Sequence, residues 1–382
     1  MSTTTREHDT PDVPVVDHAL DRVSGIVAAP VRPAPRALGP TILAGGLLLA
    51  LVLAQLWHPA LAVVTAYLAV LVVAYVAFRM VSGSRVATDR VMRLLMYGAF
   101  VVALLPLVSV MWTVIGEGAA RAFSPGFLQQ TMNGVTGVND AAYAEGTGDF
   151  VGGAYHAVIG TLIITALASI ISIPIGLFTA IYLVEYSAGN KLSHSIRFLV
   201  DVMTGIPSIV AGLFAFALWA TLFGIGTKNA LGGAVALAVL MIPTVVRNSE
   251  EMLRIVPNEL REAALALGVP KWRVVAKVVL PTAASGLASG VTLAIARVIG
   301  ETAPLLVAVG FTHALNTNPT SGPMNSLALF AYQMFTRPLN PGVRDPSLER
   351  AWAAALLLVL LVVILNLGAR LVAALFAPKT GR

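Results

Sequence analysis

Eight long apolar runs constrain the fold of this chain more than any other feature of its sequence. They cover 41–57, 60–78, 94–115, 156–182, 198–223, 231–246, 284–310 and 351–376. They are 16 to 27 residues long, close to the length a helix needs to cross a bilayer whose interior offers the backbone no water. Only 12% of the residues are charged and 57% are hydrophobic. We therefore predict an all-α, polytopic membrane protein with about eight transmembrane helices.

The runs divide the chain into three parts. His58-Pro59 separates the first two runs, and a proline in so short a gap favours a tight helical hairpin at 38–80. Residues 1–37, with several prolines and mixed charges, are predicted to form a disordered tail. The segment 94–376 is predicted to form the main transmembrane domain, with a long polar loop at 247–281.

The basic residues predict the orientation. One set of segments between runs, the termini included, holds 19 Lys and Arg, the other holds five, and Arg297 lies inside a run. Because cytoplasmic loops retain basic residues, both termini and the 247–281 loop are expected in the cytoplasm. Asp201, close to a predicted cytoplasmic end, is interpreted as a solvated carboxylate.

Local signals divide the 247–281 loop into two short helices. Asn258 suits an N-cap, Gly268 suits the left-handed residue that ends a helix, and Pro270 suits the first turn of the next. Leu280-Pro281 is expected to stop the second helix. The small residues of the first helix would let it seat in a groove of another protein. A plain amphipathic loop on the lipid headgroups is the alternative.

The spacing within this loop resembles a family signature. Glu262-Ala263-Ala264 is followed by three residues, Gly268, nine residues, Val278, one residue, and Leu280-Pro281. This resembles the coupling loop of binding-protein-dependent importer permeases of the ABC class, apart from valine at 278, where that family usually has isoleucine. The resemblance implies that Glu262, Ala263, Ala264, Gly268, Leu280 and Pro281 form the docking element for a cytoplasmic ATPase.

Two opposite charges lie within the seventh apolar run. Arg297 and Glu301 stand four residues apart, so on a continuous helix they would share a face and could neutralise each other. A charge at this depth is costly and usually faces a partner or a polar pathway. A structural ion pair is one interpretation. An anion pathway is the other, because an arginine fork can hold a tetrahedral oxyanion by paired hydrogen bonds.

The run from Arg297 to Leu306 resembles the A-type permease subunit of phosphate importers, and so do the stretches 180–186 and 205–214. The resemblance covers roughly 94–376 and implies a six-helix importer core in a bacterial inner membrane; the first 93 residues have no counterpart. It implies a homologous C-type permease, two copies of an ATPase that uses ATP and Mg²⁺, an extracytoplasmic phosphate-binding protein, and phosphate as substrate. A permease for molybdate, sulfate or phosphonate is an alternative, as is a membrane sensor or scaffold for the ATPase.

Pro207, Gly300 and Pro304 are candidates for gating kinks, with close helix packing as an equal alternative. The chain has no Gly-rich phosphate loop, so ATP hydrolysis is assigned to a partner and no cofactor to this chain. It shows no catalytic constellation and no metal-ligand cluster, and its basic residues lie in loops between runs. An enzyme and a nucleic-acid-binding protein are therefore not expected.

Overall fold

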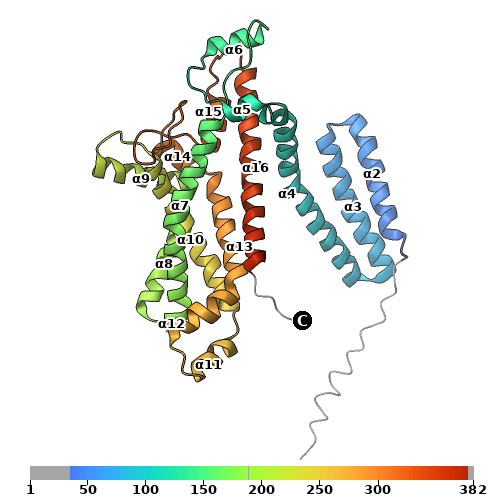
Figure 1. Cartoon of the computed structure of the whole chain (residues 1–382). Helices are drawn as coiled ribbons and strands as arrows, with labels where there is room; N and C mark the ends of the chain where they lie inside the picture. The colour runs from blue at the N-terminus through green and yellow to red at the C-terminus, as the bar shows by residue number, and fades with distance from the viewer. Residues whose placement is uncertain (1–34, 188, 377–382) are drawn as a thin grey trace, which may run out of the picture. The chain divides into compact units, whose positions relative to one another are not determined.

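Helices account for all the regular structure in the part of the chain that the structure describes. The structure is a computed structural model that describes residues 35–187 and 189–376, with side chains as far as Leu371. The predicted tail falls almost wholly outside these residues. Figure 1 shows the helices in chain order: α2 (Leu38–Leu56), α3 (Pro59–Ser82), α4 (Ser84–Ala122), α5 (Pro125–Gln129), α6 (Gly137–Ala144), α7 (Tyr155–Ile181) with the π-helical turn η1 (Tyr182–Tyr186), α8 (Lys191–Thr204), α9 (Ser208–Phe223), α10 (Ala230–Ile255), α11 (Asn258–Ala266), α12 (Lys271–Val274), the π-helical turn η2 (Val275–Val279), α13 (Leu280–Ile299), α14 (Ala303–Ala308), α15 (Leu327–Thr336) and α16 (Asp345–Phe376).

Seven of the described helices are long and apolar enough to cross a membrane, and the bent pair α8–α9 makes an eighth if it is counted as one span. The chain is thus a multi-pass helical membrane protein, as its apolar runs predict. It divides into two compact units, Met1–Ser109 and Val110–Arg382, and α4 contributes to both.

The first unit contains the hairpin of α2 and α3. The imidazole Nδ1 of His58 accepts a hydrogen bond from the backbone N–H of Ala60 at 3.3 Å, which caps α3 just after the turn. Buried residues recur on α3 at every fourth position, namely Ala62, Ala66, Val70, Ala74 and Phe78. This spacing forms one apolar stripe along the helix.

The second unit is organised around α10, the most buried of the spans. Its apolar residues pack with those of α7, α13 and α14. Gly176 of α7 lies so close to α10 that an added Cβ would stand 2.6 Å from Cγ1 of Val245. Small residues permit such close helix packing in membranes, where van der Waals contact replaces the hydrophobic driving force.

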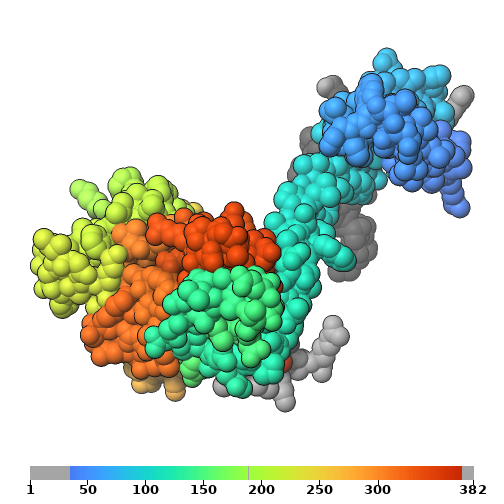
Figure 2. Space-filling view, turned by 90° about the horizontal axis from the view of Figure 1, so that it is seen from above, coloured from blue at the N-terminus to red at the C-terminus, as the bar shows by residue number. Residues whose placement is uncertain are grey.

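The two ends of this unit differ. At one end, the α6 end, the helices α5, α6 and α15 cap the bundle around a buried apolar cluster that includes Phe127, Met132 and Phe330. Figure 2 looks onto this end, where the green residues of α5 and α6 lie beside the orange-red residues of α15 and α16. At the opposite end, the α11 end, a smaller cluster joins the end of α10 to α12 and η2.

Candidate functional site

The first element of the candidate site is a broken helix. Gly205, Ile206 and Pro207 separate α8 from α9, and the two helices are bent by 106°. Proline cannot donate a backbone hydrogen bond and disfavours the helical conformation of the residue before it, so the two helices do not join. The predicted span over 198–223 is therefore bent, with its bend at Pro207, one of the kink candidates. Helix α9 begins with Ser208 at the break, where its unpaired amides leave a partial positive charge.

A second break lies in the run that was predicted to continue from 284 to 310. Helix α13 ends at Ile299, Gly300 follows as its C-cap, and α14 starts only at Ala303. Pro304 fits this arrangement because it stands in the first turn of α14, where its missing N–H would have no helical partner. Glu301 thus lies between two helices and not on a continuous helical face.

These two breaks meet at a cavity of about 220 Å³ beside the middle of α10. Its lining contains both of the charged residues that the sequence analysis selected. The wall is formed by Met203, Thr204, Ile206, Ser208, Leu240, Pro243, Thr244, Arg297, Val298 and Glu301. Helix α10 runs from 230 to 255, so Pro243 and Thr244 place the cavity near the midpoint of a span.

Arg297 is exposed in this chain and Glu301 is half-buried. Among the described residues, no hydrogen bond or ion pair joins the two side chains or links either to another group. The ion pair that was one of the two interpretations does not form within this chain, because α13 ends between the two residues. An arginine left unpaired in hydrocarbon would cost at least a few kcal/mol. Arg297 must therefore face water, an anion or another subunit.

The gating and packing candidates lie around the same cavity. Pro207 and Gly300 stand at the two breaks. Gly212 on α9 packs directly against Pro304, since an added Cβ would lie 2.6 Å from the Pro304 Cα, whereas a Cβ on Gly300 would meet nothing within 4 Å. The absence of a side chain at 212 thus lets the two broken segments touch.

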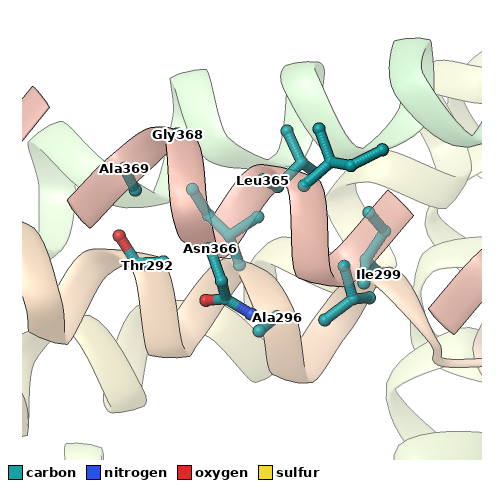
Figure 3. Close-up of a pocket in the computed structure, with 10 residues that line it drawn as sticks. Thr292, Ala296, Ile299, Leu365, Asn366, Gly368 and Ala369 are labelled. Atoms are coloured by element: carbon teal, nitrogen blue, oxygen red, sulfur yellow. The ribbon is translucent and has the colours of Figure 1, made fainter. Parts of the chain in front are cut away.

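A larger groove of about 410 Å³ between α13 and α16 has a different character. Figure 3 shows that apolar side chains such as Ile299 and Leu365 form most of its wall, and that Thr292 and Asn366 are its polar residues. It contains no charged side chain. This groove therefore offers nothing to balance the charge of an oxyanion, in contrast to the cavity at Arg297.

The loop that carries the Glu262 motif is shorter than predicted. Helix α10 extends to Ile255, so Arg247 lies within it. Helix α11 begins at Asn258 itself, with Pro257 at the N-cap position; Asn258 therefore does not cap it, and its side chain instead accepts a hydrogen bond from Arg261. Gly268 has the expected left-handed backbone, with φ of +75°.

Leu280-Pro281 does not stop a helix. The helical path continues through α12, η2 and α13, and Pro281 stands in the first turn after the π-helical segment. The wider turn accommodates a residue that has no N–H to donate to the preceding turn. Pro270 precedes the start of α12 at Lys271 as its N-cap.

No residue of α11 is buried, although the helix carries several apolar residues. Leu265 and Leu267 are exposed, as are Glu262 and Ala263. Exposed leucines beside small residues on a helix outside the bundle are typical of a surface that another protein covers.

One arginine fixes α11 to the bundle. The guanidinium of Arg261 donates hydrogen bonds to the backbone oxygen of Leu253 at 2.8 Å and to the Glu185 carboxylate, with Nε 3.0 Å and Nη2 2.9 Å from Oε1. Glu185 lies in η1, at the end of α7, and its side chain is 6% exposed. Sequence reasoning noticed the stretch 180–186 but not this pair, whose members stand 76 positions apart.

Residues 172–382 match the family described as "Binding-protein-dependent transport system inner membrane component", which is more than half of the chain. The chain belongs to this family of transport permeases. The permease is 43% identical to "Phosphate transport system permease protein PstA 1" of Mycobacterium tuberculosis (strain CDC 1551 / Oshkosh), over 78% of its own length and 92% of that protein. It is 41% identical to "Phosphate transport system permease protein PstA" of Mycobacterium leprae (strain TN), over 76% and 90% of the two chains. It is 40% identical to the protein of the same name from Pasteurella multocida (strain Pm70), over 58% of this chain and 76% of that protein.

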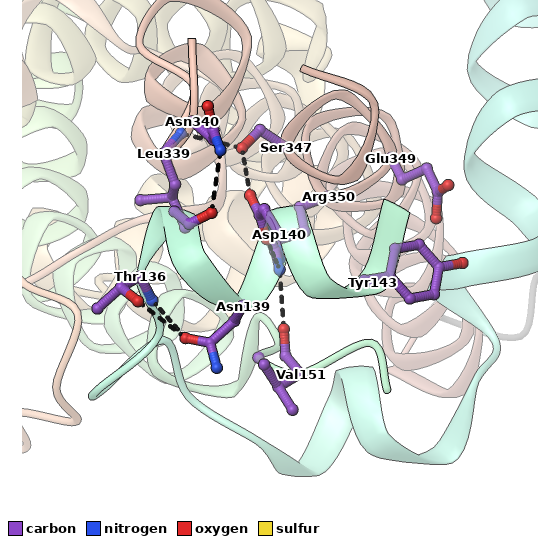
Figure 4. A network of polar contacts seen from close by, with 12 residues as sticks. Thr136, Asn139, Asp140, Tyr143, Val151, Leu339, Asn340, Ser347, Glu349 and Arg350 are labelled. Carbon is purple, nitrogen blue, oxygen red and sulfur yellow. Dashed lines mark hydrogen bonds and ion pairs between the residues drawn. The ribbon is translucent and has the colours of Figure 1, made fainter. Parts of the chain in front are cut away.

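At its α6 end the permease has a buried ion pair that sequence reasoning missed (Figure 4). Asp140 of α6 and Arg350 of α16 are each 1% exposed, and their closest oxygen and nitrogen atoms lie 2.7 Å apart. Ser347 donates a further hydrogen bond to Asp140, and Arg350 also donates to the backbone oxygen of Val151. The Asp140 carboxylate thus accepts three hydrogen bonds, whereas the buried Nε of Arg350 has no hydrogen-bond partner among the described residues. The buried pair still suits a group that holds the cap on the bundle.

Proposed function

We propose that this chain is a permease subunit of an ATP-driven phosphate importer and that Arg297 stands on the anion path. The observation that carries the assignment is an exposed arginine, without a partner among the described residues, in the wall of a cavity that lies beside the middle of α10 and between two broken helices. Interrupted helices near the bilayer midplane form substrate sites in other transporters because they bring backbone dipoles and side chains to one point. The names of the three relatives support phosphate as the anion.

The open side of the cavity implies a second permease. Arg297 is exposed in the single chain, and an exposed cation cannot face lipid at that depth without a large cost. A homologous C-type permease that covers this face would close the cavity and leave phosphate between the two chains. Glu301 would offer Arg297 an alternative ion pair when phosphate is absent, so that the anion is not held too tightly to leave.

The exposed helix α11 is the proposed contact for the cytoplasmic ATPase. Glu262, Ala263, Ala264 and Gly268 would seat in a groove of one of two ATPase copies, which use ATP and Mg²⁺ while the permease itself binds no cofactor. Leu280 and Pro281 would keep the loop in line with α13. Closure of the ATPase pair would then drive alternating access of the cavity as a rigid-body movement.

The proposed orientation places both termini and α11 in the cytoplasm of a bacterium, with the permease in the inner membrane. The α6 end would then face outward, toward a phosphate-binding protein. Because the chain has no cysteine, a single cysteine in place of Glu259, an exposed residue of α11 outside the docking motif, reports the orientation. A membrane-impermeant thiol reagent should label it in inside-out vesicles and not in intact cells.

Uptake of radiolabelled phosphate by the whole complex tests the anion path. Arg297→Gln should abolish uptake at matched membrane abundance and intact ATPase assembly, whereas Arg85→Gln, an exposed arginine at the start of α4, should transport normally. Normal uptake by Arg297→Gln would reduce Arg297 to a structural role. If unlabelled sulfate, molybdate or phosphonate inhibited the uptake as strongly as unlabelled phosphate does, one of these oxyanions would be favoured as the substrate. If the wild-type permease bound the ATPase but the complex took up no phosphate, the chain would be a sensor or scaffold for the ATPase.

The docking role has a matched control on the same helix. Glu262→Ala should lower ATPase recovery with the purified permease and uncouple ATP hydrolysis from uptake. Glu259→Ala removes another exposed carboxylate of the same helix, outside the motif, and should change neither. Equal behaviour of the two variants would argue against the docking role of Glu262.

A further inference from the structure

A second cavity, of about 250 Å³, lies on the α11 side of the Arg297 cavity. It stands between α8 and α10, and six charged side chains contribute to its wall. They are Arg197, Asp201, Arg247, Glu250, Glu251 and Arg254. Neither the Glu262 motif nor the proposed path at Arg297 makes use of these residues.

The three arginines are held very differently. Arg197 donates to Glu250 through Nε at 3.1 Å and Nη2 at 3.0 Å and also to a backbone oxygen, and Arg254 pairs with the same carboxylate. Arg247 has one partner among the described residues, Asp201, at 2.6 Å. The Arg247 side chain is 49% exposed and that of Asp201 63%. Since a guanidinium has five N–H donors, most of the donors of Arg247 remain available.

The two cavities follow one another along the same helical faces. On α10, Leu240, Thr244, Arg247 and Glu251 recur at intervals of three or four residues, so they form one row. The first two line the Arg297 cavity and the last two line the second one. On α8, Thr204 lines the Arg297 cavity, and Asp201, three residues earlier, lines the second cavity. From Thr244 to Arg247 the row advances by about 4.5 Å along the helix axis.

We propose that Arg247 is a second binding group for the transported tetrahedral oxyanion, which it receives after Arg297 and before release into the cytoplasm. Asp201 is its resident counter-ion: the anion displaces Asp201 from Arg247, and the return of Asp201 expels the anion. An exposed pair with one contact suits this exchange, because such pairs are weak and easily replaced. The proposal rests on the proposed function, since it takes the Arg297 cavity as the preceding station. It also replaces the interpretation of Asp201 as a merely solvated carboxylate.

Alanine variants in the assembled complex separate a binding role from a structural ion pair. Arg247→Ala should lower the maximal phosphate uptake rate by about ten- to a hundredfold, the effect of losing charge-assisted hydrogen bonds, with little change in half-saturating phosphate. The double variant Asp201→Ala/Arg247→Ala should be as slow. If the double variant transports like the wild type, the pair is structural and the proposal is overturned.

Arg297→Gln, measured in parallel, distinguishes this proposal from the proposed path. Loss of uptake in Arg297→Gln together with normal uptake in Arg247→Ala would overturn the second station and leave the path intact. Normal uptake in both variants would overturn both. Loss of uptake in Arg247→Ala together with normal uptake in Arg297→Gln would show that the anion does not pass from Arg297 to Arg247, and it would also contradict the proposal.

Chemical rescue gives an independent readout. Arg247→Cys provides the chain with its single cysteine, which 2-aminoethyl methanethiosulfonate converts into a cationic side chain and the 2-sulfonatoethyl reagent into an anionic one. The cationic reagent should restore a substantial part of the lost uptake and the anionic one should not, with the wild-type complex treated identically as the control. Equal effects of the two reagents would show that charge at 247 does not matter and would overturn the proposal.

Discussion

The position of helix α11 should depend on one buried interaction, which makes Arg261→Met a sharp test of how the loop is held. Methionine keeps much of the length and apolar volume of the side chain, but leaves the Glu185 carboxylate without its cation. Arg261 is 14% exposed and Glu185 6%, so water can replace little of the lost interaction. Removal of one partner of a buried pair costs about 3–5 kcal/mol. At about 1.4 kcal/mol per factor of ten, opening of the loop should become roughly a hundred- to a few-thousandfold more frequent.

Amide hydrogen exchange measures this opening directly in the purified complex. The α11 amides of Arg261→Met should lose protection by the factor given above, and more ATP should be hydrolysed per phosphate transported. Arg273→Met is the matched control, since Arg273 is an exposed arginine of the same loop whose contact is with the ring of Trp272. Its loss should cost less than about 1 kcal/mol. A loss of α11 protection in Arg261→Met no greater than in Arg273→Met would refute the reasoning.

Three further predictions concern the rest of the second unit. Arg350→Met should lower the stability of the solubilised protein by about 3–5 kcal/mol, measured by denaturant or thermal unfolding, because it strands the buried Asp140 carboxylate. Gly212→Val should lower the thermal midpoint by forcing α9 away from the α14 backbone, whereas Gly300→Ala, with open space around its added Cβ, should leave it nearly unchanged. Burial, and secondarily the charge of Arg350, lower the pKa of His313 below its ordinary value of 6.5. The folded state then binds fewer protons than the unfolded state between the two pKa values, so stability should fall as the pH drops below about 6.5, and His313→Gln should flatten that part of the stability profile.

The apolar runs predicted the spans well, but the breaks that form the cavity could be predicted only as candidate kinks at Pro207, Gly300 and Pro304, with close packing as an equal alternative. Glycine and proline give an ambiguous signal in a membrane helix. Pro174 and Pro243 lie inside the continuous helices α7 and α10, whereas Pro207 stands at a 106° bend. In each case neighbouring helices decide whether the freed carbonyls can be satisfied. That information lies in the packing, so the local sequence does not contain it.

The buried ion pairs could not be predicted from the sequence either, since their partners are distant in the chain. Asp140 and Arg350 stand 210 positions apart, and Arg350 lies just before the predicted run 351–376, outside the predicted spans. Helix α16 begins at Asp345, so Arg350 is in its second turn, with one side against the cap. By contrast, Arg297 and Glu301 could be selected from the sequence because charges within an apolar run are costly whatever their partners.

The connectivity of the second unit suggests how a movement of α11 would reach the cavity. The helical path from Lys271 to Ile299 has no break, and it joins the loop directly to Arg297. Its first interruption is Gly300, three residues beyond that arginine, and the segment after it touches α9 at Gly212. A displacement of the loop would therefore move the Arg297 charge, while the two broken segments, tied to each other, need not follow. Movement of the Arg297 charge relative to the other residues that line the cavity would change the affinity of the cavity for an anion. A coupled importer needs such a change in affinity at each turnover.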